Sequence, residues 1–106
     1  MGNRLLVVPI NSDGVTDYEA DISKRVNLQE FEFPEAEFEY MFTQGVADEL
    51  NSDLDVCIDE YEEEIIRNKL LEKALKIIEK HKKRLPVLYR ALSAAIEYDT
   101  ELCFEL

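Results

Sequence analysis

The spacing of hydrophobic residues changes along the chain, and this change constrains the fold more than any other feature. Segment 5–10 is a short apolar run rich in β-branched residues, and Leu102, Phe104 and Leu106 alternate with other side chains at the end. Both patterns are typical of strands. Between them, apolar residues recur every three or four positions, which is typical of helices. Strands first, helices in the middle and a strand last predict an α+β fold.

The N-terminal third contains turn and strand signals. Residues 11–14, Asn-Ser-Asp-Gly, predict a turn after the first strand. Apolar residues alternate with acids over 18–22, and the pattern continues over 26–33 with one slip in phase. We therefore expect two short strands here, the second with a bulge. Together with the C-terminal strand they predict a mainly antiparallel sheet.

Helix signals dominate the middle of the chain. Pro34 suits the first position of a helix, and Gly45 either ends that helix or weakens it. Segment 58–82 cannot form one straight helix, because its apolar residues change to the opposite side of a helical wheel near residues 67–69. We expect a break there, then a helix to about residue 82 and another from Pro86.

The length of 106 residues fits one domain spanning residues 1–106, and 46% hydrophobic residues suffice for a modest core. We expect about three helices packed on one face of the sheet. The sequence leaves strand order and oligomeric state open. Its longest uncharged apolar run is too short to cross a bilayer, and we find no secretory signal. Two cysteines are too few for a disulfide framework, so we expect a cytoplasmic protein.

Charge is distributed unevenly. The formal net charge is −12. Residues 67–90 contain nine basic and two acidic residues, a net +7, whereas the remainder contains 22 acids and three bases, a net −19. This acidic excess argues against binding to nucleic acid or to an anionic membrane surface, because both are recognised by clustered Lys and Arg. It permits a basic protein as a partner.

The segment 58–66, IDEYEEEII, places five acids in six positions. One interpretation is a solvated surface, with Ile58 pointing inward and Tyr61 and Ile65 covering the core. A second is a partner surface that presents carboxylates to a basic groove, with Tyr40 or Tyr61 as an aromatic anchor. The candidate partner-binding residues are Asp59, Glu60, Tyr61, Glu62, Glu63 and Glu64, together with Glu35, Glu37 and Glu39.

A third interpretation is calcium binding by residues 51–62, NSDLDVCIDEYE. This segment resembles the calcium loop of EF-hand proteins. The matching residues are Asn51, Asp53 and Asp55 at the first, third and fifth loop positions, and Asp59 and Glu62 at the ninth and twelfth. The resemblance implies a site of oxygen ligands, which suits Ca²⁺. The chain departs from the motif at Val56, where the loop has Gly, and at its first position, where Asn replaces Asp.

Signals for catalysis are sparse. His81, the single histidine, lies in a basic run and is expected to be a helix-terminal cation. Cys57 and Cys103 are expected to be small packing residues, with Cys103 facing outward from the last strand. We find no phosphate loop and expect no cofactor. A small hydrolase would need two of the 24 acids to meet in a cleft, one of them with a raised pKa.

We therefore predict a non-enzymatic protein that binds, and could inhibit, a basic macromolecular partner through an acidic surface. Bacterial immunity proteins, which neutralise toxins, are one class that acts in this way. The analogy rests on charge and size, not on a motif. A calcium-binding module at 51–62 is the alternative, and a carboxylate hydrolase is the third possibility.

Overall fold

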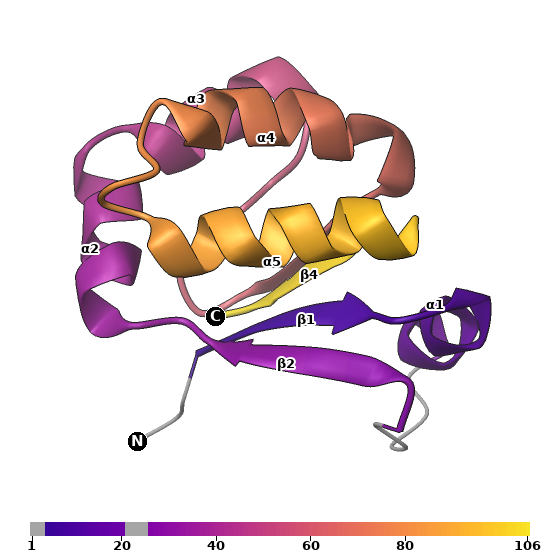
Figure 1. The fold of residues 1–106 in the computed structure, drawn as a ribbon. Coiled ribbons are helices and arrows are strands. Elements are labelled where there is room, and N and C mark those ends of the chain that lie inside the picture. The colour runs from indigo at the N-terminus through magenta and orange to yellow at the C-terminus, as the bar shows by residue number, and fades with distance from the viewer. Residues whose placement is uncertain (1–3, 21–25) are drawn as a thin grey trace.

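A computed structural model of the chain describes residues 4–20 and 26–106. Its four strands form one antiparallel sheet in the order β2-β1-β4-β3. Figure 1 labels the first three of these strands. The strands are β1 (Leu5–Pro9), β2 (Leu28–Glu32), β3 (Glu63–Ile66) and β4 (Leu102–Glu105). β1 and β4 are central, and β2 and β3 are the edges. The predicted α+β class and antiparallel sheet are confirmed.

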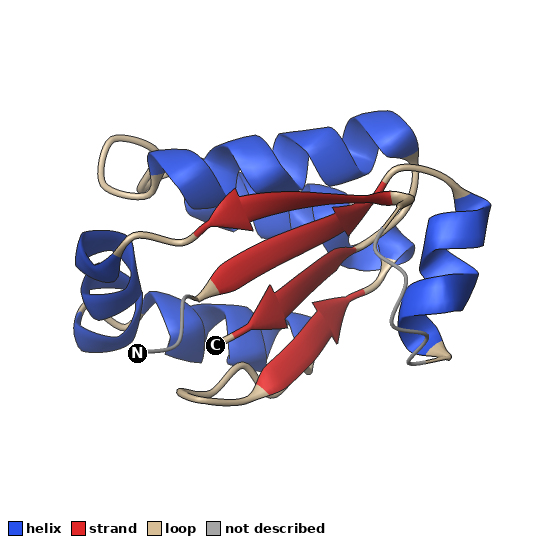
Figure 2. Cartoon of the chain, turned by 90° about the horizontal axis from the view of Figure 1, so that it is seen from below, coloured by secondary structure: helices blue, strands red, loops and turns tan. Residues whose placement is uncertain are grey.

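The helices lie mainly on one side of this sheet (Figure 2). They are α1 (Ser12–Glu19), α2 (Glu35–Thr43), α3 (Val46–Leu54), α4 (Leu71–Glu79) and α5 (Pro86–Tyr98), with a short 3₁₀ helix η1 (Asn68–Leu70) before α4. Helix α5 lies against the sheet, α4 packs on α5, and α3 packs on α4. Helix α1 stands apart from the others, beside β1 at one end of the sheet (Figure 1).

One hydrophobic core joins the sheet to these helices. The side chains of Leu6, Val8 and Phe104 face it from the two central strands, and Leu88 and Leu92 face it from α5. All five are fully buried. Alternation along the strands explains this arrangement, because every second side chain of β1 and β4 points to the same face.

Residues that alternate with those core positions lie on the other face of the sheet. Val7 and Cys103 are paired across β1 and β4, and neither belongs to the core cluster. Both are nevertheless fully buried. Cys103 therefore faces away from the core cluster, as the alternation predicts, but it is buried and not exposed, because this second face of the sheet is also covered at its centre.

Helix α1 replaces the turn and the strand predicted for this region. Asn11 caps it by accepting a hydrogen bond from the backbone N–H of Gly14 at 2.9 Å. Asn is favoured at this position because its side-chain oxygen satisfies a free N–H of the first turn. The turn signal was thus a helix start, and Tyr18 is helical. The rest of the predicted strand falls partly on residues 21–25, outside the described residues.

Other boundaries differ in smaller ways. β2 pairs with β1 in unbroken register, so the predicted bulge is absent from residues 28–32. Gly45 adopts a left-handed conformation, with φ of 77°, and it separates α2 from α3. The predicted break near residues 67–69 is confirmed, since η1 occupies residues 68–70. α4 ends at Glu79, a few residues before the predicted end near residue 82, and turns follow it.

Candidate functional site

The acidic segment 59–64 forms a turn followed by the first half of the edge strand β3. The side-chain amide of Asn51 holds this turn, because it accepts a hydrogen bond from the Ile58 N–H at 2.7 Å and donates one to the Ile58 carbonyl at 2.9 Å. The N–H of Leu106 donates to the carbonyl of Glu62 at 3.2 Å. The turn is therefore fixed on both sides by residues outside it.

Tyr61 has an unusual place in this turn. Its side chain is 75% exposed, and its φ of 64° puts the backbone in the left-handed region. Bulky residues rarely adopt this conformation. The Arg4 guanidinium lies 5.7 Å from the centre of the Tyr61 ring and 3.6 Å from that of Phe38. The idea that Tyr61 covers the core is wrong, whereas Ile58 points inward as expected.

Four of the predicted acids surround Tyr61 and are exposed, namely Asp59, Glu60, Glu62 and Glu63. A fifth, Glu35, comes from the start of α2, and its carboxylate lies 2.6 Å from the Arg4 guanidinium. Because Arg4 also contacts the Tyr61 ring, the start of α2 lies beside the turn. Glu39 is exposed on α2. We call the group Asp59–Glu63 the acidic turn.

Two predicted residues have other roles. Glu37 is 4% exposed, and its carboxylate accepts hydrogen bonds from the backbone N–H groups of Val87 at 3.0 Å and Leu88 at 3.2 Å. It satisfies the free N–H groups at the start of α5 and is not part of an open surface. Tyr40, the alternative anchor, is hydrogen bonded to His81 at 3.0 Å.

Glu64 also differs from its predicted role. Its carboxylate accepts hydrogen bonds from the N–H of Cys57 at 2.7 Å and from the N–H of Ile65 at 2.8 Å. The second contact satisfies an N–H group of β3, and the first ties the loop at Cys57 to this strand. An edge strand with unpaired backbone groups invites pairing with other chains. Glu64 therefore stabilises and protects this edge.

The resemblance to a calcium loop does not extend to its conformation. Residues 51–54 are the last turn of α3, and Asp55 follows in a left-handed conformation. The Asn51 amide is occupied by Ile58. In the described part of the chain, no group of three or more His, Cys, Asp or Glu side chains is placed to hold a metal ion. All of residues 51–62 belong to that part.

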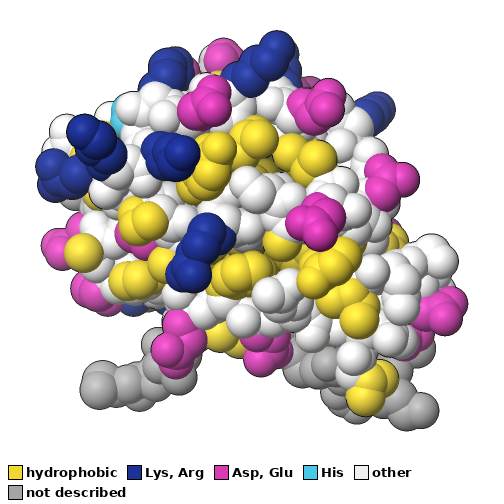
Figure 3. Space-filling model, viewed as in Figure 1, with side chains coloured by type: hydrophobic (Ala, Val, Ile, Leu, Met, Phe, Trp, Pro, Cys, Tyr) yellow, Lys and Arg dark blue, Asp and Glu magenta, His cyan; other side chains and the backbone are white. Residues whose placement is uncertain are grey.

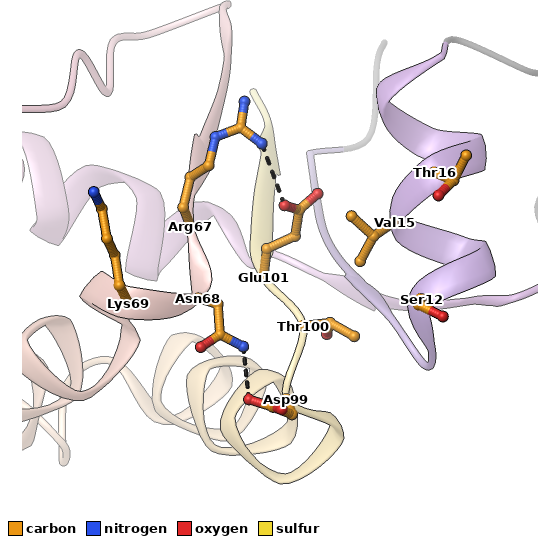
Figure 4. Close-up of a pocket in the computed structure, with 9 residues that line it drawn as sticks. All are labelled: Ser12, Val15, Thr16, Arg67, Asn68, Lys69, Asp99, Thr100 and Glu101. Carbon is orange, nitrogen blue, oxygen red and sulfur yellow. Dashed lines mark hydrogen bonds and ion pairs between the residues drawn. The ribbon is translucent and has the colours of Figure 1, made fainter.

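A second polar site lies where α1 meets the sheet. It borders a cleft of about 580 Å³ between α1, η1 and the start of β4 (Figure 4). The Arg67 guanidinium lies 2.6 Å from the carboxylate of Glu19 and 3.5 Å from that of Glu101. On the same side of the sheet, the Tyr18 hydroxyl donates a hydrogen bond to Glu105 at 2.9 Å. Three elements thus contribute charged groups to one place.

The pKa values of the two carboxyl groups in this second site are shifted in opposite directions. Burial is the main cause that raises the pKa of Glu101 to about 7, and a hydrogen bond with Glu19 is the second cause. The same hydrogen bond is the main cause that lowers the pKa of Glu19, and one with Arg67 is the second. Burial, reinforced by the charge of Glu101, raises the pKa of the Cys103 thiol. Glu101 lines the cleft, and Glu19 beside it has a pKa shifted in the opposite direction, so the pair is a candidate acid–base site.

Few features of the sequence indicate this second site. Glu19, Arg67 and Glu101 are far apart in the chain. Glu19 ends α1, Arg67 lies between β3 and η1, and Glu101 directly precedes β4. One signal was available. Glu101 shares the alternation of Cys103 and Glu105, which places three titratable residues on one side of the last strand.

No family model matches the chain, and no curated protein or solved structure matches it either. None of the helices in residues 4–20 and 26–106 is long and apolar enough to cross a membrane.

Proposed function

We propose that the chain is a non-enzymatic protein that binds, and inhibits, a basic macromolecular partner through the acidic turn. The observation that carries this proposal is the conformation of Tyr61, which is held in a left-handed backbone region with its ring exposed. Strained positions of this kind cluster at functional sites, since the surrounding structure must support their cost. Here the support comes from Asn51 and Arg4.

The chemistry of the acidic turn suits this role. An exposed tyrosine ring offers a large and rigid contact area, and tyrosine is enriched among residues that dominate binding energy. The four exposed carboxylates around it would attract a basic partner and accelerate its association. Because the turn is already fixed by hydrogen bonds, binding would order few side chains.

Affinity capture with charge-reversal variants tests the proposal. The tagged chain and two triple variants would capture proteins from a lysate of the organism that encodes it, with mass spectrometry to identify them. The test variant changes Glu60, Glu62 and Glu63 to Lys. The control changes Glu72, Glu79 and Glu97 to Lys, which alters net charge equally on α4 and α5. We expect one basic protein to be retained by the parent chain and the control, and lost from the test variant.

Tyr61→Gly separates the ring from the charges, because glycine tolerates the left-handed backbone at this position. We expect it to weaken capture without changing net charge. For a purified partner, the association rate should fall as salt concentration rises. Equal loss in both triple variants, or binding unaffected by charge reversal and salt, would contradict the proposal.

A small hydrolase is the second candidate, and one observation favours it. Glu101 has a pKa raised to about 7 beside a cleft, and Glu19 next to it has a lowered pKa. Hydrolases use such pairs as acid and base. Purified chain would be assayed against chromogenic esters, phosphates and glycosides. Activity abolished by Glu101→Gln, with partner capture unchanged, would favour hydrolysis.

A further inference from the structure

A separate cleft lies beside the acidic turn, and we call it the α3 cleft. It has a volume of about 350 Å³ and is bordered by the end of α2, the start of α3 and the loop that precedes the acidic turn. Phe42, Ala47, Val56 and Ile58 give it apolar walls. Asp59, the first residue of the acidic turn, also lines it, so the cleft is continuous with the proposed binding surface.

The walls of the α3 cleft are held in place by packing and by hydrogen bonds. The Phe42 ring packs on that of Phe38, with the two ring centres 5.0 Å apart. Ala47 and Ile58 belong to the hydrophobic core. The two hydrogen bonds between the Asn51 amide and the Ile58 backbone join the loop to α3. A ligand would therefore enter a preformed site and order few protein groups.

Two exposed carboxylates line this cleft, those of Asp48 and Asp59. Asp48 lies in the first turn of α3, and no hydrogen bond or ion pair joins its side chain to another described residue. One oxygen of Asp59 accepts a hydrogen bond from the Glu60 N–H at 2.8 Å, and no described cation pairs with this carboxylate. The α3 cleft therefore combines apolar walls with two negative charges that the described chain does not neutralise.

The basic residues of the chain gather elsewhere. Figure 3 shows Lys and Arg side chains over α4 and the turn that follows it. Lys80, at the end of α4, reaches α3, but its ammonium lies 2.7 Å from the carboxylate of Glu49, the residue next to Asp48. Among the described residues, no Lys or Arg lines the α3 cleft. A cation that occupies this cleft would thus come from another molecule.

Apolar walls with carboxylates beside them suit a side chain that has an apolar stem and a cationic tip, as Lys and Arg do. Arginine fits better, because its planar guanidinium stacks on aromatic rings and has enough N–H donors for two carboxylates. The protein already contains one such contact. The Arg4 guanidinium lies 3.6 Å from the centre of the Phe38 ring and 2.6 Å from the Glu35 carboxylate. Phe42 and the two aspartates offer the same chemistry to an arginine from outside.

We propose that the α3 cleft receives an arginine side chain of the basic partner, with its stem against Phe42 and Val56 and its guanidinium bound by Asp48 and Asp59. This inference rests on the proposed function, since it assumes that the acidic turn binds a basic partner. It adds a contact that determines specificity. The exposed acids of the turn would accelerate association with any basic surface, whereas the α3 cleft would select one type of residue at one position.

Three small probes test the inference, namely the N-acetyl amides of arginine, lysine and citrulline. The lysine probe keeps the charge of arginine without the planar guanidinium, and the citrulline probe keeps the shape without the charge. Each would be titrated into the ¹⁵N-labelled chain and followed by NMR at constant ionic strength, because salt screens exposed charges. Asp48→Asn is the test variant. Asp53→Asn is the matched control, because Asp53 is an exposed acid of the same helix that does not line the cleft.

We expect the arginine probe to shift the amide signals of the residues that line the α3 cleft, with a Kd on the order of 1 mM for so small a ligand. The lysine and citrulline probes should bind at least about three-fold more weakly. Asp48→Asn should weaken binding of the arginine probe by about five-fold, and Asp53→Asn by less than about two-fold.

Binding of the lysine or citrulline probe as tight as that of arginine, or equal losses in the two variants, would overturn the inference. Signals that broaden with protein concentration in the parent chain but not in Asp48→Asn would also overturn it, because the occupant would then be a second copy. Shifts confined to residues 60–63 would overturn it and leave the proposed function standing. Arginine-specific shifts at the cleft, in a chain whose acidic turn captures no partner, would support the arginine site and contradict the proposed function.

Discussion

The guanidinium of Arg67 lies 2.6 Å from the carboxylate of Glu19, at the end of α1, and 3.5 Å from that of Glu101, just before β4. Glu101 is only 3% exposed. Helix α1 has few apolar residues, and Gly14 is its one fully buried member. Its attachment to the sheet therefore depends on polar side chains, which makes this part of the fold sensitive to pH.

The first prediction concerns this pH dependence. Between about pH 4.5 and 7, the folded chain retains a proton on Glu101 that the unfolded chain has released, so stability should fall as pH rises. The lowered pKa of Glu19 acts in the opposite sense, and its contribution is lost as the pH falls through that lowered value. Glu101→Gln should remove most of the decline, which we expect to be roughly 2 kcal/mol.

Urea unfolding of the parent chain and Glu101→Gln at pH 5, 6, 7 and 8 measures this difference. Glu97→Gln is the control, because Glu97 is exposed on α5. Parallel pH profiles for the parent chain and Glu101→Gln would show that Glu101 does not bind its proton more tightly in the folded state.

A second prediction compares two glutamates on the same helix. Glu37→Ala should lower the free energy of unfolding by about 1–3 kcal/mol, because it leaves two backbone N–H groups at the start of α5 without their acceptor. Glu39→Ala removes the same charge from an exposed position and should change stability by less than about 0.5 kcal/mol. Chemical denaturation measures both, and similar losses would argue against the capping role.

A third prediction uses Asn51→Asp to separate two interpretations of residues 51–62. If the segment binds calcium as an EF-hand loop does, aspartate at the first position should strengthen binding. In the structure, the Asn51 amide donates to the Ile58 carbonyl, and a carboxylate cannot. We expect the variant to lose about 1–2 kcal/mol of stability and to show equal melting temperatures in calcium and magnesium. A rise specific to calcium would favour the calcium module.

A fourth prediction distinguishes two glycines. A Cβ atom at Gly14 would lie 2.3 Å from the backbone oxygen of Asn27, so Gly14→Ala must displace α1 or the chain before β2. A Cβ atom at Gly45 would meet nothing within 4 Å, and its cost would come from the left-handed backbone alone. We expect Gly45→Ala to cost about 1 kcal/mol. Gly14→Ala should cost more, and thermal unfolding that ranks them in the reverse order would contradict this account.

Local signals predicted much of the fold. The strand near residues 5–9, the helix that begins at Pro86 and the final strand were predicted from apolar spacing and from proline at a first helical position. These signals succeed because they depend on backbone geometry within a few residues. The signal at residues 11–14 was ambiguous, because Asn favours both turns and helix starts.

The burial and the contacts of individual acidic side chains could not be predicted in this way. Glu37 and Glu39 have similar local sequence, yet one is buried and the other is exposed. The difference arises from Val87, 50 residues away, whose N–H binds the Glu37 carboxylate. The raised pKa of Glu101 likewise depends on its burial and on Glu19 from α1.

The sequence by itself determined the α+β class, the positions of most strands and helices, and the acidic character of the chain. Tertiary structure decided which carboxylates face water, which cap a helix or an edge strand, and which share a proton. The physical reason is that backbone periodicity is local, whereas the environment of a charged side chain is set by whichever distant segments the fold places beside it.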